Sequence, residues 1–196
     1  QAIKHPNWKM GKKISLDSAT LMNKVFEVIE AQRIFNIDIR KFEIFIHPKS
    51  YIHSIVKFKN GQIKIMAHEP NMKIPIFSSI YNEKYKPIPT SKINIKILNN
   101  LKLEKINLKK YPCVKILNKI TNKNTLFETV LVSANDELVN LYLMKKINFL
   151  DIYKNLMKIL RMKKYSKLIN KKPNHLREIL NLSKEVRLKT MNLCIK

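Results

Sequence analysis

Four polar side chains near the start of the sequence have types that could bind a phosphorylated, metal-bound substrate. They are Ser18, Asn23, Lys24 and Glu27. Asn23 and Glu27 are four residues apart and Lys24 and Glu27 three apart, so in a helix their side chains share one surface patch. Serine and lysine donate hydrogen bonds to phosphate, and hard divalent cations prefer carboxylate ligands. Exposed Lys–Glu pairs and capping serines are also ordinary features of solvated helices, so both interpretations stand at this point.

A helix over residues 19–35 is predicted to carry this patch. Asp17 and Ser18 are good N-cap residues for it. A buried stripe at three-to-four spacing consists of Met22, Val25, Phe26 and Ile29. The first turn of such a helix has free N–H donors and a positive dipole, which suit a bound phosphate.

The residues before this helix form a loop of unusual composition. It contains His5, Trp8 and Gly11, and so an imidazole, a large indole and a position without a side chain. Such a composition is typical of lids that close over a ligand and exclude water. We therefore predict a lid directly before the helix that carries the polar patch.

Residues 5–35 resemble the 1-deoxy-D-xylulose 5-phosphate reductoisomerase family over the pattern HPNWxMGxKISxDSATxMNKxxExIEA. Further matches follow in the order IHPKSYIHSIV (46–56), HEPNMKIPI (68–76), KYPCVKI (110–116) and SANDELV (133–139). The resemblance covers nearly the whole chain and becomes faint toward its end. It implies an NADPH-dependent enzyme of isoprenoid biosynthesis that converts 1-deoxy-D-xylulose 5-phosphate to 2-C-methyl-D-erythritol 4-phosphate.

The resemblance also implies a role for each candidate side chain. His5 corresponds to a catalytic, substrate-contacting histidine of the lid, and Trp8 to the catalytic-site indole that covers the substrate. Ser18 corresponds to a residue at the substrate phosphate. Asn23 and Lys24 correspond to residues at the substrate hydroxyl and phosphate oxygens, and Lys24 is also assigned to catalysis.

Two cofactors, NADPH and Mg or Mn, follow from the same resemblance. Gly11 corresponds to a loop glycine whose backbone lies beside the nicotinamide. Glu27 corresponds to one of three carboxylate ligands of the divalent ion, next to the substrate. A hard cation there would polarise the carbonyl and hydroxyl oxygens of the substrate during the rearrangement that precedes hydride transfer.

Other parts that the family requires have no counterpart in these residues. No G-x-G-x-x-G motif occurs, since Gly11 and Gly61 are the only glycines, and two metal carboxylates and an upstream phosphate-binding serine are missing. We expect the C-terminal half of a longer, homodimeric enzyme that lacks its N-terminal NADPH-binding domain. The isolated chain is expected neither to bind metal tightly nor to turn over substrate. A half-protein with a separately encoded partner and a decayed, inactive copy are the alternatives.

The hydrophobic patterning predicts an α+β fold, in which part of a catalytic domain with a mixed or antiparallel sheet is followed by a C-terminal α-helical bundle. The predicted boundaries are 1–82 for the catalytic part with its lid, 83–108 for a linker and 109–196 for the bundle. Alternating segments at 50–58 and 62–67 around Asn60-Gly61 predict a β-hairpin, and 92–98 alternates like an added strand. Helices are predicted at 114–120, 126–132, 135–146, 150–162 and 175–193, with Ser133, Asn135 and Asp151 as caps and a basic loop at 163–173.

The formal net charge of +25 points to a competing class, a basic non-enzymatic nucleic-acid-binding protein. Lysines outnumber arginines and are scattered over every segment, and no stripe of basic and aromatic residues stands out. We attribute the charge to compositional bias and expect no specific nucleic acid as a partner. Two distant cysteines and the lack of a long apolar run predict a reducing compartment without a membrane span, which is the bacterial cytoplasm or a plastid-type organelle.

Overall fold

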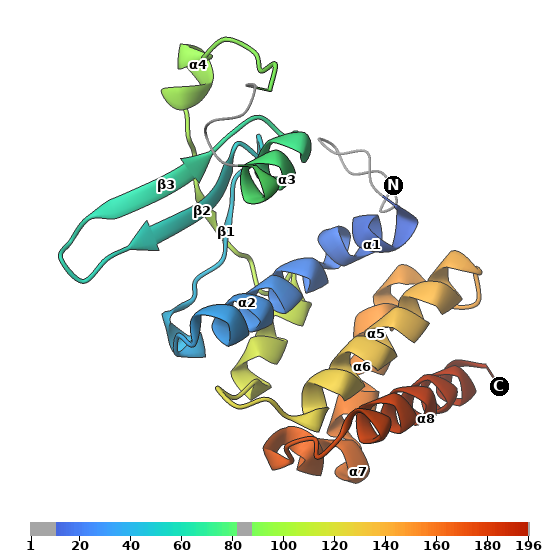
Figure 1. Cartoon of the computed structure of the whole chain (residues 1–196). Coiled ribbons are helices and arrows are strands. Elements are labelled where there is room, and N and C mark those ends of the chain that lie inside the picture. Colours follow the sequence, from blue (N-terminus) through green and yellow to red (C-terminus); the bar gives the residue numbers. More distant parts are fainter. Residues whose placement is uncertain (1–10, 82–87, 196) are drawn as a thin grey trace. The chain divides into compact units, whose positions relative to one another are not determined.

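The computed structural model describes residues 11–81 and 88–195, which form two compact units (Figure 1). Among the described residues, the first unit comprises 11–43 and 107–195, and the second comprises the segment between them. This division differs from the boundaries that the sequence predicted, because the first helices belong to the same unit as the C-terminal bundle.

Helices build the first unit. The α-helices are α1 (Lys12–Thr20), α2 (Met22–Phe35), α5 (Leu126–Leu143), α6 (Phe149–Arg161), α7 (Lys163–Ser166) and α8 (Leu176–Cys194). The described residues also form the 3-10 helices η1 (Ile39–Lys41), η2 (Pro112–Lys119) and η3 (Lys167–Asn170). The central helix α5 packs against α6 and α8 and also contacts α1, while α2 packs against η2 (Figure 1).

One hydrophobic core joins α2 to the bundle. Its buried side chains include Met22 and Val25 of α2, Cys113 and Ile116 of η2, Leu131 and Leu138 of α5, Leu156 of α6 and Val186 of α8. Full burial of such a side chain contributes about 1.5–3 kcal/mol. Since both side chains of α2 are fully buried in this cluster, α2 is part of the bundle rather than of a separate catalytic domain.

Local capping signals misled the prediction inside the bundle. Residues 126–143 form a single helix, and Ser133 and Asn135, predicted as caps, are buried in its interior. Thr125 is the N-cap, and it forms a capping box with Glu128. The local preference of Ser133 for a cap is overridden because its Oγ donates a hydrogen bond to Ser183 Oγ of α8 at 2.8 Å.

Three further predictions for the bundle need correction. Helix α6 starts one turn earlier than Asp151 implied, because Asn148 is the N-cap and Asp151 is its capping-box partner. The predicted basic loop at 163–173 contains α7 and η3, since Tyr165 is buried and its hydroxyl donates to Glu185 Oε1 at 2.7 Å. The predicted helix at 114–120 is the 3-10 helix η2.

The second unit contains a β-hairpin as predicted. Strands β2 (Ile52–Lys57) and β3 (Ile63–Ala67) pair antiparallel, with Ile55 opposite Ile65. Gly61 in the connecting turn has a φ of +87°, a left-handed conformation that glycine adopts without strain. The described sheets are antiparallel, which confirms the predicted α+β class.

The rest of the second unit departs from the predicted linker. It contains β1 (Phe45–Ile46), α3 (Lys73–Ile80), α4 (Ile95–Leu98) and β4 (Glu104–Lys105). Strand β4 pairs with β1, so this end of the predicted linker is part of the unit. The predicted strand at 92–98 is wrong, because the Asn94 side chain accepts a hydrogen bond from the Ile97 N–H at 3.2 Å and starts the helical turn α4.

The longest helices of the bundle have one buried and one solvated side. Helix α5 has 18 residues and contains partly exposed Glu128, Asp136 and Glu137, while α8 has 19 residues and contains exposed charged side chains. Within residues 11–81 and 88–195, no helix has the length and apolarity needed to cross a membrane.

The two cysteines differ in accessibility, which predicts different reactivity. Cys113 is 1% exposed, and burial raises the pKa of its thiol to about 12. Cys194 is partly exposed, although burial raises the pKa of its thiol as well. Because the thiolate is the nucleophile, we expect iodoacetamide to label Cys194 first and Cys113 only in denaturant, as measured by peptide mass spectrometry. Equal labelling rates in the native protein would contradict this assignment.

Candidate substrate and metal site

The candidate site lies where α1 meets α2. Leu21 separates the two helices and has a left-handed backbone with φ 57° and ψ 20°. Ser18 comes from the last turn of α1, whereas Asn23, Lys24 and Glu27 come from the first turns of α2. The structure therefore brings together the polar patch that the spacing predicted, with Ser18 contributed by a different helix.

This junction corrects the predicted start of the helix at residue 19. Asp17 and Ser18 are not N-caps but lie inside α1, and α2 begins at Met22. The break has a local cause, since the Thr20 hydroxyl donates to the Leu16 and Asp17 carbonyls at 3.2 Å. Thr20 Oγ1 also accepts the Met22 N–H at 3.4 Å, so one side chain ends α1 and satisfies a donor at the start of α2.

Ser18 and Asn23 form a polar pair across the junction. Asn23 Nδ2 donates to Ser18 Oγ at 3.3 Å, and both side chains are half-buried. Asn23 Oδ1 is buried and accepts no hydrogen bond from the residues that the structure describes. A buried acceptor without a donor is costly, so this atom is suited to receive a hydrogen bond from a ligand hydroxyl.

Lys24 and Glu27 form an exposed ion pair beside them. Lys24 Nζ lies 2.9 Å from Glu27 Oε1 and 2.8 Å from Oε2, with side chains 42% and 54% exposed. Exposed pairs of this kind contribute little to stability. Both groups can therefore exchange their mutual contact for an anionic and a cationic ligand at little cost.

The described residues supply only part of a metal site. Glu27 presents a solvent-accessible carboxylate, which fits one ligand position of a hard cation. No group of three His, Cys, Asp or Glu side chains arranged for a metal occurs in residues 11–81 or 88–195. Further oxygen ligands would have to come from outside these residues.

The predicted lid falls largely outside the described residues. His5 and Trp8 lie outside the described residues, so their roles stay predictions. Gly11 is exposed and starts α1, and its carbonyl accepts the Ser15 N–H at 3.0 Å. A Cβ atom added at Gly11 would meet nothing within 4 Å, so packing among the described residues does not require glycine there.

Sequence reasoning missed the partners that hold α1. Asp17 is 4% exposed, and its Oδ1 accepts a hydrogen bond from Asn135 Nδ2 of α5 at 2.8 Å. Asn135 itself is 1% exposed. Both residues lie inside the motifs DSAT and SANDELV that carried the family resemblance, which was the one available signal.

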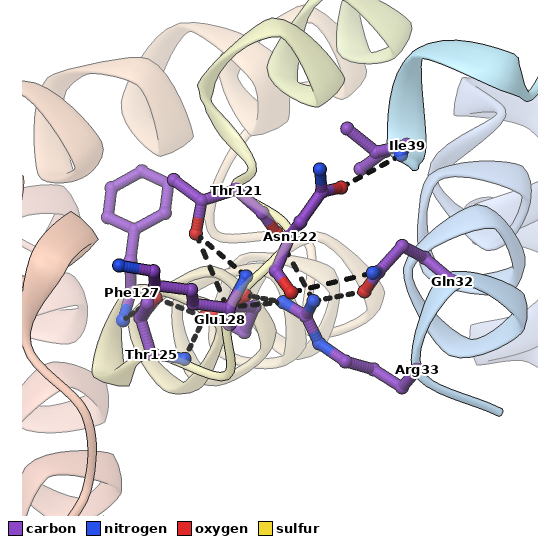
Figure 2. Close-up of polar contacts among 9 residues, drawn as sticks. Gln32, Arg33, Ile39, Thr121, Asn122, Thr125, Phe127 and Glu128 are labelled. Carbon is purple, nitrogen blue, oxygen red and sulfur yellow. Dashed lines mark hydrogen bonds and ion pairs between the residues drawn. The ribbon is translucent and has the colours of Figure 1, made fainter. Parts of the chain in front are cut away.

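A second polar cluster fixes the other end of α2 (Figure 2). The Arg33 guanidinium reaches the loop before α5, where it donates to the carbonyls of Thr121 at 3.2 Å and Lys123 at 2.7 Å. It also pairs with Glu128, the capping-box residue of α5. The side chains of Arg33 and Glu128 are 21% and 17% exposed, so water screens this pair only weakly.

Two family models match this chain, one over its first 35 residues and one over most of the remainder. The model described as "DXP reductoisomerase C-terminal domain" matches residues 68–189. The model described as "1-deoxy-D-xylulose 5-phosphate reductoisomerase C-terminal domain" matches residues 1–35. The 1-deoxy-D-xylulose 5-phosphate reductoisomerase of Pelagibacter ubique is 52% identical over 194 residues, which are 99% of this chain and 50% of that protein.

Solved structures agree in fold. A DOX-P reductoisomerase in complex with NADPH, fosmidomycin and magnesium superposes with a TM-score of 0.87 and 31% identity, over 97% of this chain and 48% of that one. The Zymomonas mobilis enzyme in complex with NADPH has a TM-score of 0.81 and 30% identity, over 100% of this chain and 49% of that one. The α+β architecture is thus that of a reductoisomerase C-terminal region. The chain belongs to the 1-deoxy-D-xylulose 5-phosphate reductoisomerase family and spans about half the length of these relatives.

Proposed function

We propose that this chain forms the substrate-binding part of an NADPH-dependent reductoisomerase that converts 1-deoxy-D-xylulose 5-phosphate to 2-C-methyl-D-erythritol 4-phosphate. The observation that carries the proposal is the convergence of Ser18, Asn23, Lys24 and Glu27 at the α1–α2 junction of a chain from this family. The dinucleotide-binding domain would be supplied by residues other than these 196.

The polar atoms at the junction have complementary tasks in this proposal. Ser18 Oγ accepts from Asn23, which leaves the serine hydroxyl proton to donate to a phosphate oxygen. Asn23 Oδ1 accepts from a substrate hydroxyl. Lys24 and the backbone N–H groups in the first turn of α2 add positive charge for the phosphate.

Glu27 would hold one position of the Mg or Mn ion once its contact with Lys24 opens. The ion, when bound, polarises the substrate oxygens as a Lewis acid. His5 and Trp8 would close over the substrate and exclude water, and the backbone at Gly11 would face the nicotinamide.

The hairpin of the second unit supports the proposal of a homodimer. Ile55, Ile63 and Ile65 lie on one face of the hairpin of β2 and β3, where they are 39–59% exposed. A two-stranded hairpin is marginally stable in water, and contiguous exposed apolar side chains mark interaction surfaces. We propose that a second copy of the enzyme covers this hairpin.

Turnover of the substrate tests the proposed function. We expect the isolated chain to show no NADPH oxidation with 1-deoxy-D-xylulose 5-phosphate and Mg²⁺, because it provides one metal carboxylate and no dinucleotide motif. A fusion of the chain to the N-terminal half of the Pelagibacter ubique relative should oxidise NADPH in the presence of this substrate. The full-length Pelagibacter ubique relative is the positive control. Activity of the isolated chain would contradict the half-enzyme proposal. An inactive fusion that folds and binds NADPH would contradict the function.

A further inference from the structure

A polar cluster links α1 to α5 and α8, with Asp17 and Asn135 buried and Lys13 and Arg187 partly exposed. The Asp17 carboxylate accepts from Asn135 Nδ2 at 2.8 Å and from Lys13 Nζ at 3.1 Å. Lys13 Nζ also lies 2.9 Å from Asp136 Oδ1, and Asp136 Oδ2 accepts from Arg187 of α8 at 2.7 Å. Two cations and two anions alternate, so the cluster is neutral overall.

The cluster holds Asp17 in a single geometry. An unpaired buried carboxylate costs several kcal/mol, so Asp17 must keep its donors in place. Burial acts to lower the pKa of Lys13, but the contacts with Asp136 and Asp17 outweigh it and raise that pKa, which keeps the lysine charged. The position of α1 is therefore tied to that of Asn135.

The backbone carbonyls of Asp17 and Ser18 are hydrogen-bonded as well. The Asp17 carbonyl accepts from the Thr20 hydroxyl at 3.2 Å, and the Ser18 carbonyl accepts from the Leu21 N–H at 3.1 Å. Both the side chain and the backbone of Asp17 are thus held. Ser18 can then meet Asn23 across the junction.

Packing alone does not explain why residue 135 is an asparagine. Its Oδ1 is buried and accepts no hydrogen bond from the described residues, a cost that an apolar side chain of similar size would avoid. Its amide nitrogen donates to Asp17. The contact with Asp17 therefore accounts for an amide at this position.

We propose that Asn135 is a positioning residue, which acts through Asp17 to hold the end of α1 so that Ser18 faces the phosphate of the substrate and Asn23 faces a substrate hydroxyl. The identity of that substrate rests on the proposed function, whereas the positioning rests on the contacts described above. Asn135 does not itself contact the substrate.

Kinetics of the fusion enzyme test this role. In Asn135→Leu we expect KM for the sugar phosphate to rise about 10-fold with kcat within about 2-fold of wild type, since a site that is correctly positioned in about one tenth of the molecules binds about tenfold more weakly. Asn135→Asp keeps the size of the side chain but places a second carboxylate next to Asp17. Two adjacent ionised carboxylates repel, so the ratio of the KM of this variant to that of wild type should rise with increasing pH. The matched control Asp151→Asn weakens a capping box on α6 and should leave KM unchanged.

A second measurement does not depend on turnover. In NMR spectra of the 196-residue chain, the Asn23 side-chain amide and Ser18 backbone amide signals should move in Asn135→Leu and stay in place in Asp151→Asn. Unmoved signals together with an unchanged KM would overturn the positioning role. Moved signals in a chain whose wild-type fusion is inactive would uphold the positioning role and overturn the proposed function.

Discussion

Replacing Glu27 by glutamine in the fusion enzyme is expected to lower kcat at least about 100-fold. The carboxylate is the one metal ligand that the family resemblance assigns to this chain, and it is exposed at the start of α2. A metal acting as Lewis acid stabilises the transition state by several kcal/mol, and each 1.4 kcal/mol corresponds to about tenfold in rate. Glutamine keeps the shape but removes the charge, so Mn²⁺ should bind more weakly in a titration followed by electron paramagnetic resonance.

The matched control for this change is Glu30→Gln. Glu30 is an exposed carboxylate one turn further along the same helix, so this variant removes the same charge while keeping the four side chains of the patch. It should retain wild-type kcat and Mn²⁺ affinity. Comparable activity of the two variants, or a Glu27→Gln enzyme with unchanged Mn²⁺ affinity, would refute the metal assignment.

Replacing Arg33 by methionine is expected to lower the free energy of unfolding by about 2–3 kcal/mol. The guanidinium joins α2 to the loop before α5, and its loss leaves the Thr121 and Lys123 carbonyls without these donors and Glu128 without its cation (Figure 2). Methionine retains the apolar part of the arginine side chain, so the decrease in the free energy of unfolding measures the contribution of the polar contacts. Urea unfolding followed by circular dichroism measures the difference as a lower midpoint.

Arg40→Met provides the comparison for this variant. Arg40 pairs with Asp38, but its side chain is 85% exposed, so water replaces the pair readily. The guanidinium of Arg40 holds the pKa of the Asp38 carboxyl well below its usual range, yet this proximity does not imply a large contribution to stability. We expect an unchanged midpoint for Arg40→Met. An equal decrease in the unfolding midpoint of both variants would show that the loss of a positive charge, and not of the Arg33 contacts, lowers the stability.

Patterns that depend on near neighbours were read correctly from the sequence. The hairpin around Asn60-Gly61 forms because only the local turn has to accept the left-handed conformation at Gly61. Asn23, Lys24 and Glu27 share a patch because helical spacing alone brings them together. The long helix α8 was predicted almost to the residue for the same reason.

Patterns that depend on residues far apart in the sequence were not predicted correctly. Asp17 and Asn135 both resemble helix caps, and both are instead buried in helices because they bond to each other across 118 positions of the sequence. One near-neighbour pattern was also misread, because Asn94 caps a helical turn where a strand at 92–98 was predicted. The predicted division at residues 82 and 108 did not anticipate that Met22 and Val25 share a core with η2 and α5.

The sequence by itself determined the family, the α+β class and the types of side chain at the candidate site, since these depend on residue identity and short-range spacing. The tertiary structure decided which buried polar partners hold α1 and α2 in place, such as Asn135 for Asp17. Those features depend on the burial of polar groups, whose cost is set by donors and acceptors that the fold brings from far along the chain.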